Sequence, residues 1–355
     1  MKASRLDRVM RGMENMGLNQ ALVTATESVY YLTGQWIAPG ERLLALLIGP
    51  KGVKLFVNHM FQAPEIEGLE LIEFDDADDS VAALAGHVSS GRLGVDKAWP
   101  SRFLLSLMEK RPDVQPVNGS APVDEARMRK DAEEIAALKI SSHMNDRVTG
   151  ALRKSLAEGE TELDAARRYG ELAAAEGASG LGFEPLICFG AGCAEPHHVT
   201  GKARLKKGDS VILDVGVNID HALSDMTRTV FFGGATDEQK KVYETVKAAN
   251  AAGKAAVKPG VPLCEIDRAA RSVIEQAGYG PNFLHRTGHG LGLEVHEPPD
   301  VSSVSPAIAQ PGMVFSVEPG VYLPGKFGVR VEDLVLVMED GCECLNELDR
   351  EFMIV

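Results

Sequence analysis

Long hydrophobic runs are missing from this sequence, and no apolar stretch approaches the roughly 18 residues that a membrane-spanning helix needs. Residues 1–17 are charged and amphipathic, and they lack the pattern of a signal peptide. Cysteine is sparse: the five cysteines form an odd set without CxxC spacing, which provides neither a disulfide framework nor a thiolate zinc site. These absences exclude a membrane role and favour a cytoplasmic protein.

Basic residues are outnumbered by acidic ones, 37 against 51, which gives a net charge of −14. A protein of this charge is a poor partner for a phosphate backbone, so we expect no nucleic-acid binding. The hydrophobic fraction of 45% is ordinary for a globular protein, and 355 residues are enough for two cores. The sequence therefore predicts a globular protein with two domains.

The predicted domain boundary is the turn-rich, charge-free stretch Pro116–Val123. Residues 1–122 alternate short helices and strands and read as a small α/β domain. No cluster of reactive side chains occurs in this domain, so we expect it to serve dimerisation, regulation or closure of a pocket. Residues 123–355 then form the second, larger domain.

The larger domain shows long helices between antiparallel strand pairs. One long helix is predicted from about Asp124 to Ala157, and capping boxes at Thr161 and Thr236 open two more. Strands are predicted at 210–217, 226–232, 313–322 and 328–338. This order predicts an α+β domain rather than a doubly wound sheet.

Two carboxylates lie in Val211–Phe232, which reads as two strands joined by a tight Asn-Ile-Asp-His connection. A hairpin register can direct Asp214 and Asp225 into one cavity. Burying two carboxylates among apolar residues is costly unless something positive meets them. The alternative is a pair of half-exposed acids on a strand surface.

Six of the nine histidines fall between residues 197 and 296. His197 and His198 are adjacent, and His285, His289 and His296 occur in LHRTGHGLGLEVHE, where glycines allow the backbone to approach a site closely. A single histidine is more often structural than functional. Three histidines at spacings of four and seven among glycines instead indicate a site.

Two further acids, Glu318 and Glu332, interrupt apolar strands near the C-terminus, although an exposed strand face would explain each of them equally well. Together with Asp214 and Asp225 they supply four negative charges beside one imidazole. An oxygen-rich set of this kind suits manganese, cobalt or similar ions, and two divalent cations would balance four carboxylates. Two such ions can activate a water, so the set predicts a hydrolase centre.

The order of these motifs resembles the dinuclear "pita-bread" metallopeptidases, peptidase family M24. The motifs are Asp214-x10-Asp225, HGLG with His289, EPG with Glu318 and RVED with Glu332. The resemblance covers the whole chain, and its two-domain layout is similar to the prolidase and aminopeptidase P branch. It implies a C-terminal pita-bread domain preceded by a smaller creatinase-type α/β domain.

The resemblance also implies a role for each ligand position. Asp214 would hold one ion, Asp225 and Glu332 would bridge both, and His289 and Glu318 would complete the other. Glu318 would in addition accept and pass on the proton of the attacking water. The expected cofactors are two divalent metal ions, most typically manganese or cobalt, with zinc or iron as alternatives.

Further site residues follow from the same resemblance. His197 is similar to a histidine near the leaving nitrogen, and His296 to one that contacts the substrate carbonyl. His285 and Arg330 are expected to support the ligands or the product. For His198 a structural role is favoured.

The sequence departs from the family pattern at two places. His221-Ala222 replaces the family's Gly-Tyr ahead of the Ser-Asp motif that contains Asp225. Asp300 occupies the vicinity in which similar prolidases carry an arginine for the substrate's free carboxylate, and no Lys or Arg occurs from His296 through Gly325. We therefore expect tripeptides to compete with dipeptides as substrates.

The resulting hypothesis is a cytoplasmic Xaa-Pro metallopeptidase, of the prolidase or the aminopeptidase P type, that acts on short proline-containing peptides. The resemblance also implies a homodimer in which the loop Gly34–Arg42, with its apolar Trp36, approaches the partner. One alternative is a creatinase-like C–N hydrolase without metals, which the five intact ligand positions disfavour. Another is a non-catalytic binding protein on the same fold.

Overall fold

The computed structural model describes residues 1–355 and divides them into two units, Met1–Arg127 and Met128–Val355. The division falls near the end of helix α5 (Ala121–Met128), a few residues beyond the boundary predicted at 122/123. The predicted fold class is confirmed: a creatinase-type α/β unit precedes a pita-bread α+β unit. No helix combines the length and apolar character needed to cross a membrane.

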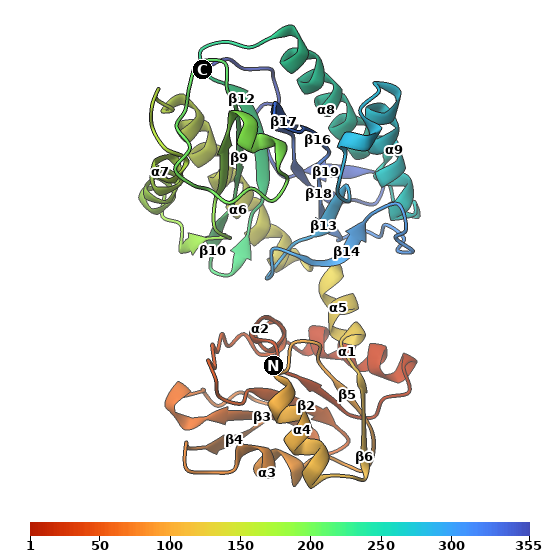
Figure 1. Ribbon diagram of the computed structural model, residues 1–355. Coiled ribbons are helices and arrows are strands. Elements are labelled where there is room, and N and C mark those ends of the chain that lie inside the picture. The colour runs from red at the N-terminus through yellow and green to blue at the C-terminus, as the bar shows by residue number, and fades with distance from the viewer. The chain divides into compact units, whose positions relative to one another are not determined.

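The first unit is built on a six-stranded sheet in the order β4-β3-β2-β1-β5-β6 (Figure 1). Its strands are β1 (Ala21–Val23), β2 (Ala45–Gly49), β3 (Gly52–Asn58), β4 (Leu69–Phe74), β5 (Gly91–Val95) and β6 (Val114–Asn118). Its helices, apart from α5, are α1 (Ala3–Asn15), α2 (Thr26–Thr33), α3 (Ser80–Ala85) and α4 (Ser101–Lys110). An apolar core that includes Phe56, Phe74 and Trp99 lies against the sheet.

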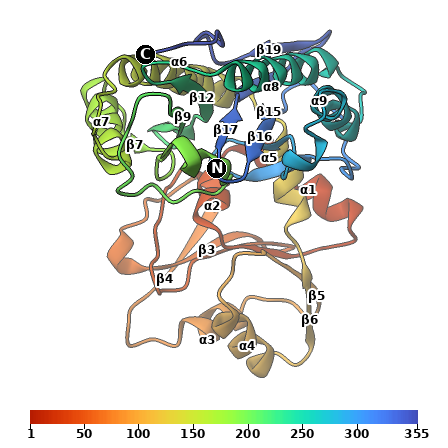
Figure 2. The ribbon, with the colours of Figure 1, turned by 45° about the horizontal axis from the view of Figure 1, so that its top comes forward.

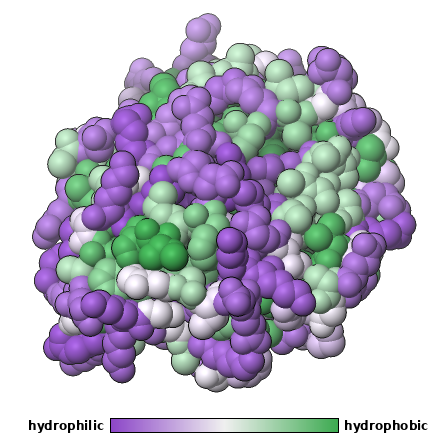
Figure 3. Space-filling model, turned by 90° about the horizontal axis from the view of Figure 1, so that it is seen from above, coloured by the Kyte–Doolittle hydropathy of each residue, from purple (hydrophilic) through white to green (hydrophobic).

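The second unit carries four long helices, in which α6 packs against α7 and α8 against α9 (Figure 2). Their bounds are α6 (Ala132–Lys154), α7 (Glu162–Ala175), α8 (Asp237–Ala256) and α9 (Leu263–Gln276). The capping boxes predicted at Thr161 and Thr236 are both present. The surface in Figure 3 is largely hydrophilic and carries its hydrophobic residues in separate groups.

The predicted helix from Asp124 to Ala157 is wrong in one respect, because it is interrupted. Asp131 begins a new helix through its own capping box with Glu134, while the Lys130 N–H donates to the carbonyl of Gly312 at 2.8 Å. The connecting residues thus pair with the sheet instead of continuing the helix.

The strands of the second unit are short and belong to several small sheets. The first sheets have the orders β11-β10-β7 and β12-β9-β8, and the others β14-β13-β15-β18-β19 and β16-β17. The strands before residue 240 are β7 (Gly180–Leu181), β8 (Leu186–Phe189), β9 (Ser210–Val215), β10 (Val217–Ile219), β11 (Ala222–Leu223) and β12 (Met226–Phe231). The later ones are β13 (Gly288–Gly290), β14 (Glu297–Val301), β15 (Val314–Val317), β16 (Gly320–Leu323), β17 (Phe327–Arg330), β18 (Asp333–Val337) and β19 (Cys342–Cys344).

Several predicted strands are in fact pairs of strands. The hairpin across 211–232 consists of β9 and β10 followed by β11 and β12, and its tight turn has positive φ at Asp220 (47°) and His221 (70°). A two-residue turn of that geometry matches the twist of the flanking strands. The predicted strands 313–322 and 328–338 are likewise divided, at Glu318-Pro319 and at Val331-Glu332.

Candidate metal centre

A cavity of about 490 Å³ lies within the second unit and receives side chains from many of its short strands. All five predicted ligands line it: Asp214 from β9, Asp225 at the start of β12, His289 from β13, Glu318 at the end of β15 and Glu332 between β17 and β18. Four other predicted site residues also line it: His197, His285, His296 and Arg330. Residues more than 100 positions apart in the chain thus meet at one place.

Backbone hydrogen bonds fix the positions of Glu318 and Glu332. Both residues lie just beyond the end of a strand, where their N–H groups still pair with a neighbouring segment. The N–H of Glu332 donates to the carbonyl of Thr227 at 3.1 Å, and that of Glu318 donates to Thr287 at 2.8 Å. Glycine is required beside His289, because a Cβ on Gly288 would lie 1.8 Å from the carbonyl oxygen of Ser316. The glycine-rich segment therefore inserts His289 tightly between neighbouring strands.

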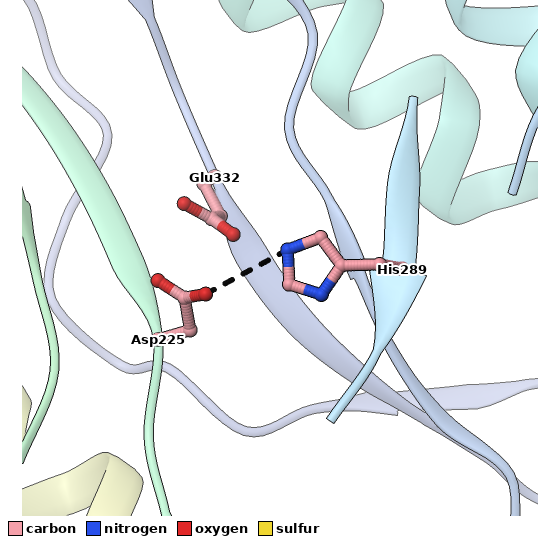
Figure 4. Close-up of side chains that lie close together, drawn as sticks. All are labelled: Asp225, His289 and Glu332. Carbon is pink, nitrogen blue, oxygen red and sulfur yellow. Dashed lines mark ion pairs between the residues drawn. The ribbon is translucent and has the colours of Figure 1, made fainter. Parts of the chain in front are cut away.

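Asp225, His289 and Glu332 form the innermost group of the cavity (Figure 4). Their possible ligand atoms all lie within 4.8 Å of one another, and all three side chains are buried. Figure 4 shows the two carboxylates and the imidazole pointing toward one another from different strands. Such convergence is the arrangement expected of metal ligands.

The tautomer of His289 suits a ligand. Its Nδ1 lies 3.1 Å from the carbonyl oxygen of Gly290, which can only accept, so Nδ1 carries the hydrogen. Burial lowers the pKa of His289 to about 4, so Nε2 carries no proton near neutrality. That nitrogen faces Glu318 Oε1 at 3.3 Å and Asp225 Oδ2 at 3.8 Å. An imidazole lone pair facing carboxylate oxygens is repulsive unless a cation lies between them.

Two buried carboxylate oxygens of the cavity lining have no hydrogen-bond partner, Oδ1 of Asp225 and Oε1 of Glu332. Burial, together with the neighbouring carboxylates, raises the pKa of both groups well above the ordinary range. Unpartnered buried oxygens are costly in a folded protein, whereas oxygen ligands of this kind are what divalent cations bind. The residues present therefore fit a divalent metal site.

Asp214 and Glu318 complete the ring of acids. Asp214 accepts from Nη2 of Arg330 at 2.5 Å, and Glu318 accepts from the hydroxyl of Ser316 at 3.1 Å. Burial raises the pKa of Glu318, which His285 and Arg330 partly offset. The sequence prediction missed Ser316, although it lies two residues before Glu318 and so on the same face of the strand.

Thr227 is another supporting residue that the sequence prediction missed. Its hydroxyl donates to Oε2 of Glu332 at 2.7 Å and accepts from Nε of Arg330 at 3.1 Å. Arg330 therefore contacts both Asp214 and the hydroxyl that holds Glu332. The strand period again provided a signal, since Thr227 follows Asp225 by two residues.

Tyr322 links Arg330 to His285. Its hydroxyl accepts from Nη1 of Arg330 at 2.9 Å and lies 2.8 Å from Nε2 of His285. Nδ1 of His285 donates to the carbonyl of Arg286 at 2.7 Å, and burial lowers the pKa of the ring, so Nε2 accepts from Tyr322. Nothing in the sequence singled out Tyr322, because its role depends on the β16–β17 hairpin.

The remaining histidines fall into two groups. The ring of His296 lies edge-on to His289 with centroids 4.1 Å apart, and burial lowers its pKa to about 4. His197 lines the cavity from the segment before β9. His198 does not line this cavity and instead contacts Oε2 of Glu162 at 2.9 Å, as expected for a structural histidine.

A cation does lie beside Asp300, and it comes from outside the segment His296–Gly325. Asp300 itself is not part of the cavity lining; it forms an ion pair with Arg286, and Arg286 does line the cavity. The sequence argument considered only residues after His296, whereas antiparallel pairing of β13 with β14 places His289 opposite Asp300 and brings Arg286 close. His221 lies in a turn outside the lining, so that departure does not alter the cavity wall.

Comparison with known proteins agrees with this architecture. The family model for metallopeptidase family M24 matches residues 136–339, and the creatinase/prolidase N-terminal domain matches residues 5–129. An uncharacterized peptidase of Staphylococcus aureus is 32% identical over 357 residues, covering 98% of this chain and all of that protein.

Two solved structures are similar over nearly the whole chain. A prolidase from Thermococcus sibiricus has a TM-score of 0.94 at 33% identity, covering 99% of this chain and 98% of that one. An Xaa-Pro dipeptidase from Bacillus anthracis has a TM-score of 0.92 at 27% identity, covering 99% of both chains. With a family model across more than half of its length and these full-length relatives, the chain belongs to metallopeptidase family M24.

Proposed function

We propose that this protein hydrolyses the Xaa-Pro bond at the N-terminus of short peptides with the help of two divalent metal ions. The observation that carries the proposal is the pair of unpartnered, buried oxygens on Asp225 and Glu332 beside an unprotonated His289 Nε2. The names of two similar proteins, a prolidase and an Xaa-Pro dipeptidase, support the choice of bond.

The four acids and one imidazole of the cavity would hold the ions: Asp214, Asp225, His289, Glu318 and Glu332. Four carboxylates and one imidazole favour manganese or cobalt over a softer, thiolate-seeking ion. When bound, such ions polarise a carbonyl and lower the pKa of a water. Arg330 would lower the negative charge of the ligand set and keep Asp214 oriented through the 2.5 Å contact.

Proton transfer would fall to Glu318. Its carboxylate borders the cavity, and its orientation is fixed by the hydroxyl of Ser316 at 3.1 Å. A carboxylate whose pKa is raised by burial is a better base for water than an exposed one, and it can later return the proton to the leaving nitrogen. His296 and His197 border the same cavity and would donate hydrogen bonds to the substrate carbonyl and to the leaving side.

A proline specialist is chemically reasonable for such a cavity. The Xaa-Pro bond is a tertiary amide without an N–H, and the ring fixes φ, so recognition by strand addition fails. Arg330 and His285 line the cavity and are held by Tyr322 behind them, so they offer a preformed wall for such a substrate. Preformed groups avoid ordering costs during binding.

The first unit would contribute to assembly. Trp36 in the loop Gly34–Arg42 is 38% exposed and lies edge-on to Tyr30 with ring centroids 5.6 Å apart. An exposed tryptophan on an ordered loop is suited to an interface. We place it at a homodimer contact of a cytoplasmic enzyme; sedimentation that shows a fully active monomer would refute this assembly.

The test is a panel of Xaa-Pro dipeptides and Xaa-Pro-Yaa tripeptides offered to protein that has been stripped of metal and then reconstituted with manganese or cobalt. We expect cleavage only after reconstitution and only before proline. Equal activity of the stripped protein would favour the creatinase-like alternative. Binding of metal without cleavage of any peptide would favour a binding protein.

A further inference from the structure

A second, smaller cavity of about 250 Å³ adjoins the metal-centre cavity and shares Glu184, Leu186 and His197 with it. We call it the side groove. Its remaining wall consists of Pro185, His198, Val199 and Thr200. The two cavities therefore adjoin along the three shared residues.

The walls of the side groove are fixed by hydrogen bonds. The hydroxyl of Thr200 donates to the carbonyl of Pro185 at 2.8 Å and accepts from the N–H of Ile187 at 2.8 Å. The opposite end is held by His198, which lies 2.9 Å from the fully buried Glu162. A groove with both walls fixed is preorganised for a ligand.

Glu184 stands out among the acids of the main cavity because its exposed carboxylate has no hydrogen bond or ion pair within the chain. Every other carboxylate that lines the cavity has a polar or charged contact: Asp214 with Arg330, Asp225 with His289, Glu318 with Ser316, and Glu332 with Thr227. The carboxylate of Glu184 is therefore unpaired at the junction of the two cavities.

The side groove also offers an apolar surface. Val199 is 85% exposed, and Leu186 is only partly buried. Long basic side chains bury an aliphatic stem against such a surface while their charged end remains near water. An apolar wall beside an unpaired carboxylate is thus complementary to lysine or arginine rather than to an acidic or purely apolar residue.

We infer that the side groove is a subsite for a cationic side chain of the peptide substrate, with Glu184 as its specificity-determining residue. This inference rests on the proposed peptidase function and adds a substrate class to it, peptides that carry lysine or arginine next to the Xaa-Pro unit or within it. A cation here gains a partly exposed ion pair, which corresponds to a preference of up to about fivefold in kcat/KM over a neutral residue of similar length.

The experiment compares two peptide series on the metal-reconstituted full-length protein. In one series the residue before proline is Lys, Met or Glu, and in the other the residue after proline is varied in the same way. The readout is the ratio of kcat/KM for the Lys and Met peptides. We expect a ratio above about two in one series, which also tells on which side of the scissile bond the groove acts.

Three variants locate the effect. Glu184→Gln should bring the Lys/Met ratio close to one, and Val199→Lys, at a site exposed enough to accept the change, should reverse the preference toward Glu peptides. Glu195→Gln is the matched control: Glu195 is an exposed acid of the same segment, lines neither cavity, and should leave the ratio unchanged.

The outcomes separate the two claims. Cleavage of Met peptides with a Lys/Met ratio near one in both series would overturn the subsite while leaving the peptidase function intact. A ratio that Glu184→Gln does not change would likewise overturn the role of Glu184. Failure to cleave any peptide of either series would refute the proposed function, and the subsite would fall with it.

Discussion

Replacing Asp300 by Asn should improve the cleavage of Xaa-Pro dipeptides relative to Xaa-Pro-Yaa tripeptides. A dipeptide presents its free carboxylate just beyond the proline, and Arg286 is a cation of the cavity lining that could meet it. In the native protein Arg286 is already paired with Asp300, so the pair as a whole attracts a carboxylate only weakly. Asp300→Asn removes the competing negative charge and leaves Arg286 available.

The size of the effect follows from the exposure of the pair. The side chains of Arg286 and Asp300 are 36% and 59% exposed, so screening is close to that of water. A substrate carboxylate about 4 Å from the Asp300 carboxylate would then be repelled by about 1 kcal/mol. Removing this repulsion corresponds to roughly a fivefold increase in kcat/KM for the dipeptide. Arg286→Gln should have the opposite effect of similar size.

The assay measures kcat/KM for matched peptides such as Ala-Pro and Ala-Pro-Ala at low ionic strength. We expect the native protein to cleave the tripeptide at least as well as the dipeptide, and Asp300→Asn to shift the ratio toward the dipeptide. Added salt should diminish the shift. A ratio that stays unchanged in both variants would refute the idea that this ion pair controls substrate length.

Three further results are expected. Asp225→Asn removes a carboxylate charge from the innermost group, so metal analysis should find fewer bound ions per chain, and turnover should collapse. Glu318→Gln should lower kcat by at least about 10²-fold, the range of general acid–base work, in steady-state assays at saturating metal. Lys130→Met should destabilise the protein by about 3–5 kcal/mol in calorimetry, because it removes the cation that lies 2.7 Å from the buried carboxylate of Glu297; the double variant Lys130→Met, Glu297→Gln should lose less.

The fold class, and the five residues that meet in the cavity, could be predicted from the sequence because both are marked by local patterns. Strand-forming runs and capping boxes are local features of the sequence. The four acids and the histidine each occur in a short motif, and the order of these motifs along the chain can be recognised. The apolar runs around Glu318 and Glu332 nevertheless predicted continuous strands, whereas each is divided at the acid. The runs on both sides of each break are buried and largely apolar. The hydrophobic pattern therefore does not reveal that the backbone pairs with a different strand after the break.

Residues whose roles depend on pairing between distant segments could not be predicted. Tyr322 contacts Arg330 only because β16 folds back on β17, and Arg286 meets Asp300 only through the pairing of β13 with β14. The interruption before Asp131 had the same origin, since Lys130 bonds to a strand 182 positions away in the chain, at Gly312. Sequence periodicity describes one element at a time and does not contain these registers.

Equilibrium dialysis of the metal-stripped protein against manganese, followed by metal analysis and an Ala-Pro assay on the same samples, tests the central claim most directly. The account predicts two ions per chain at saturation and hydrolysis that rises with metal occupancy from a negligible level. Full activity in the stripped protein would contradict the account. So would the absence of bound ions after dialysis against saturating manganese.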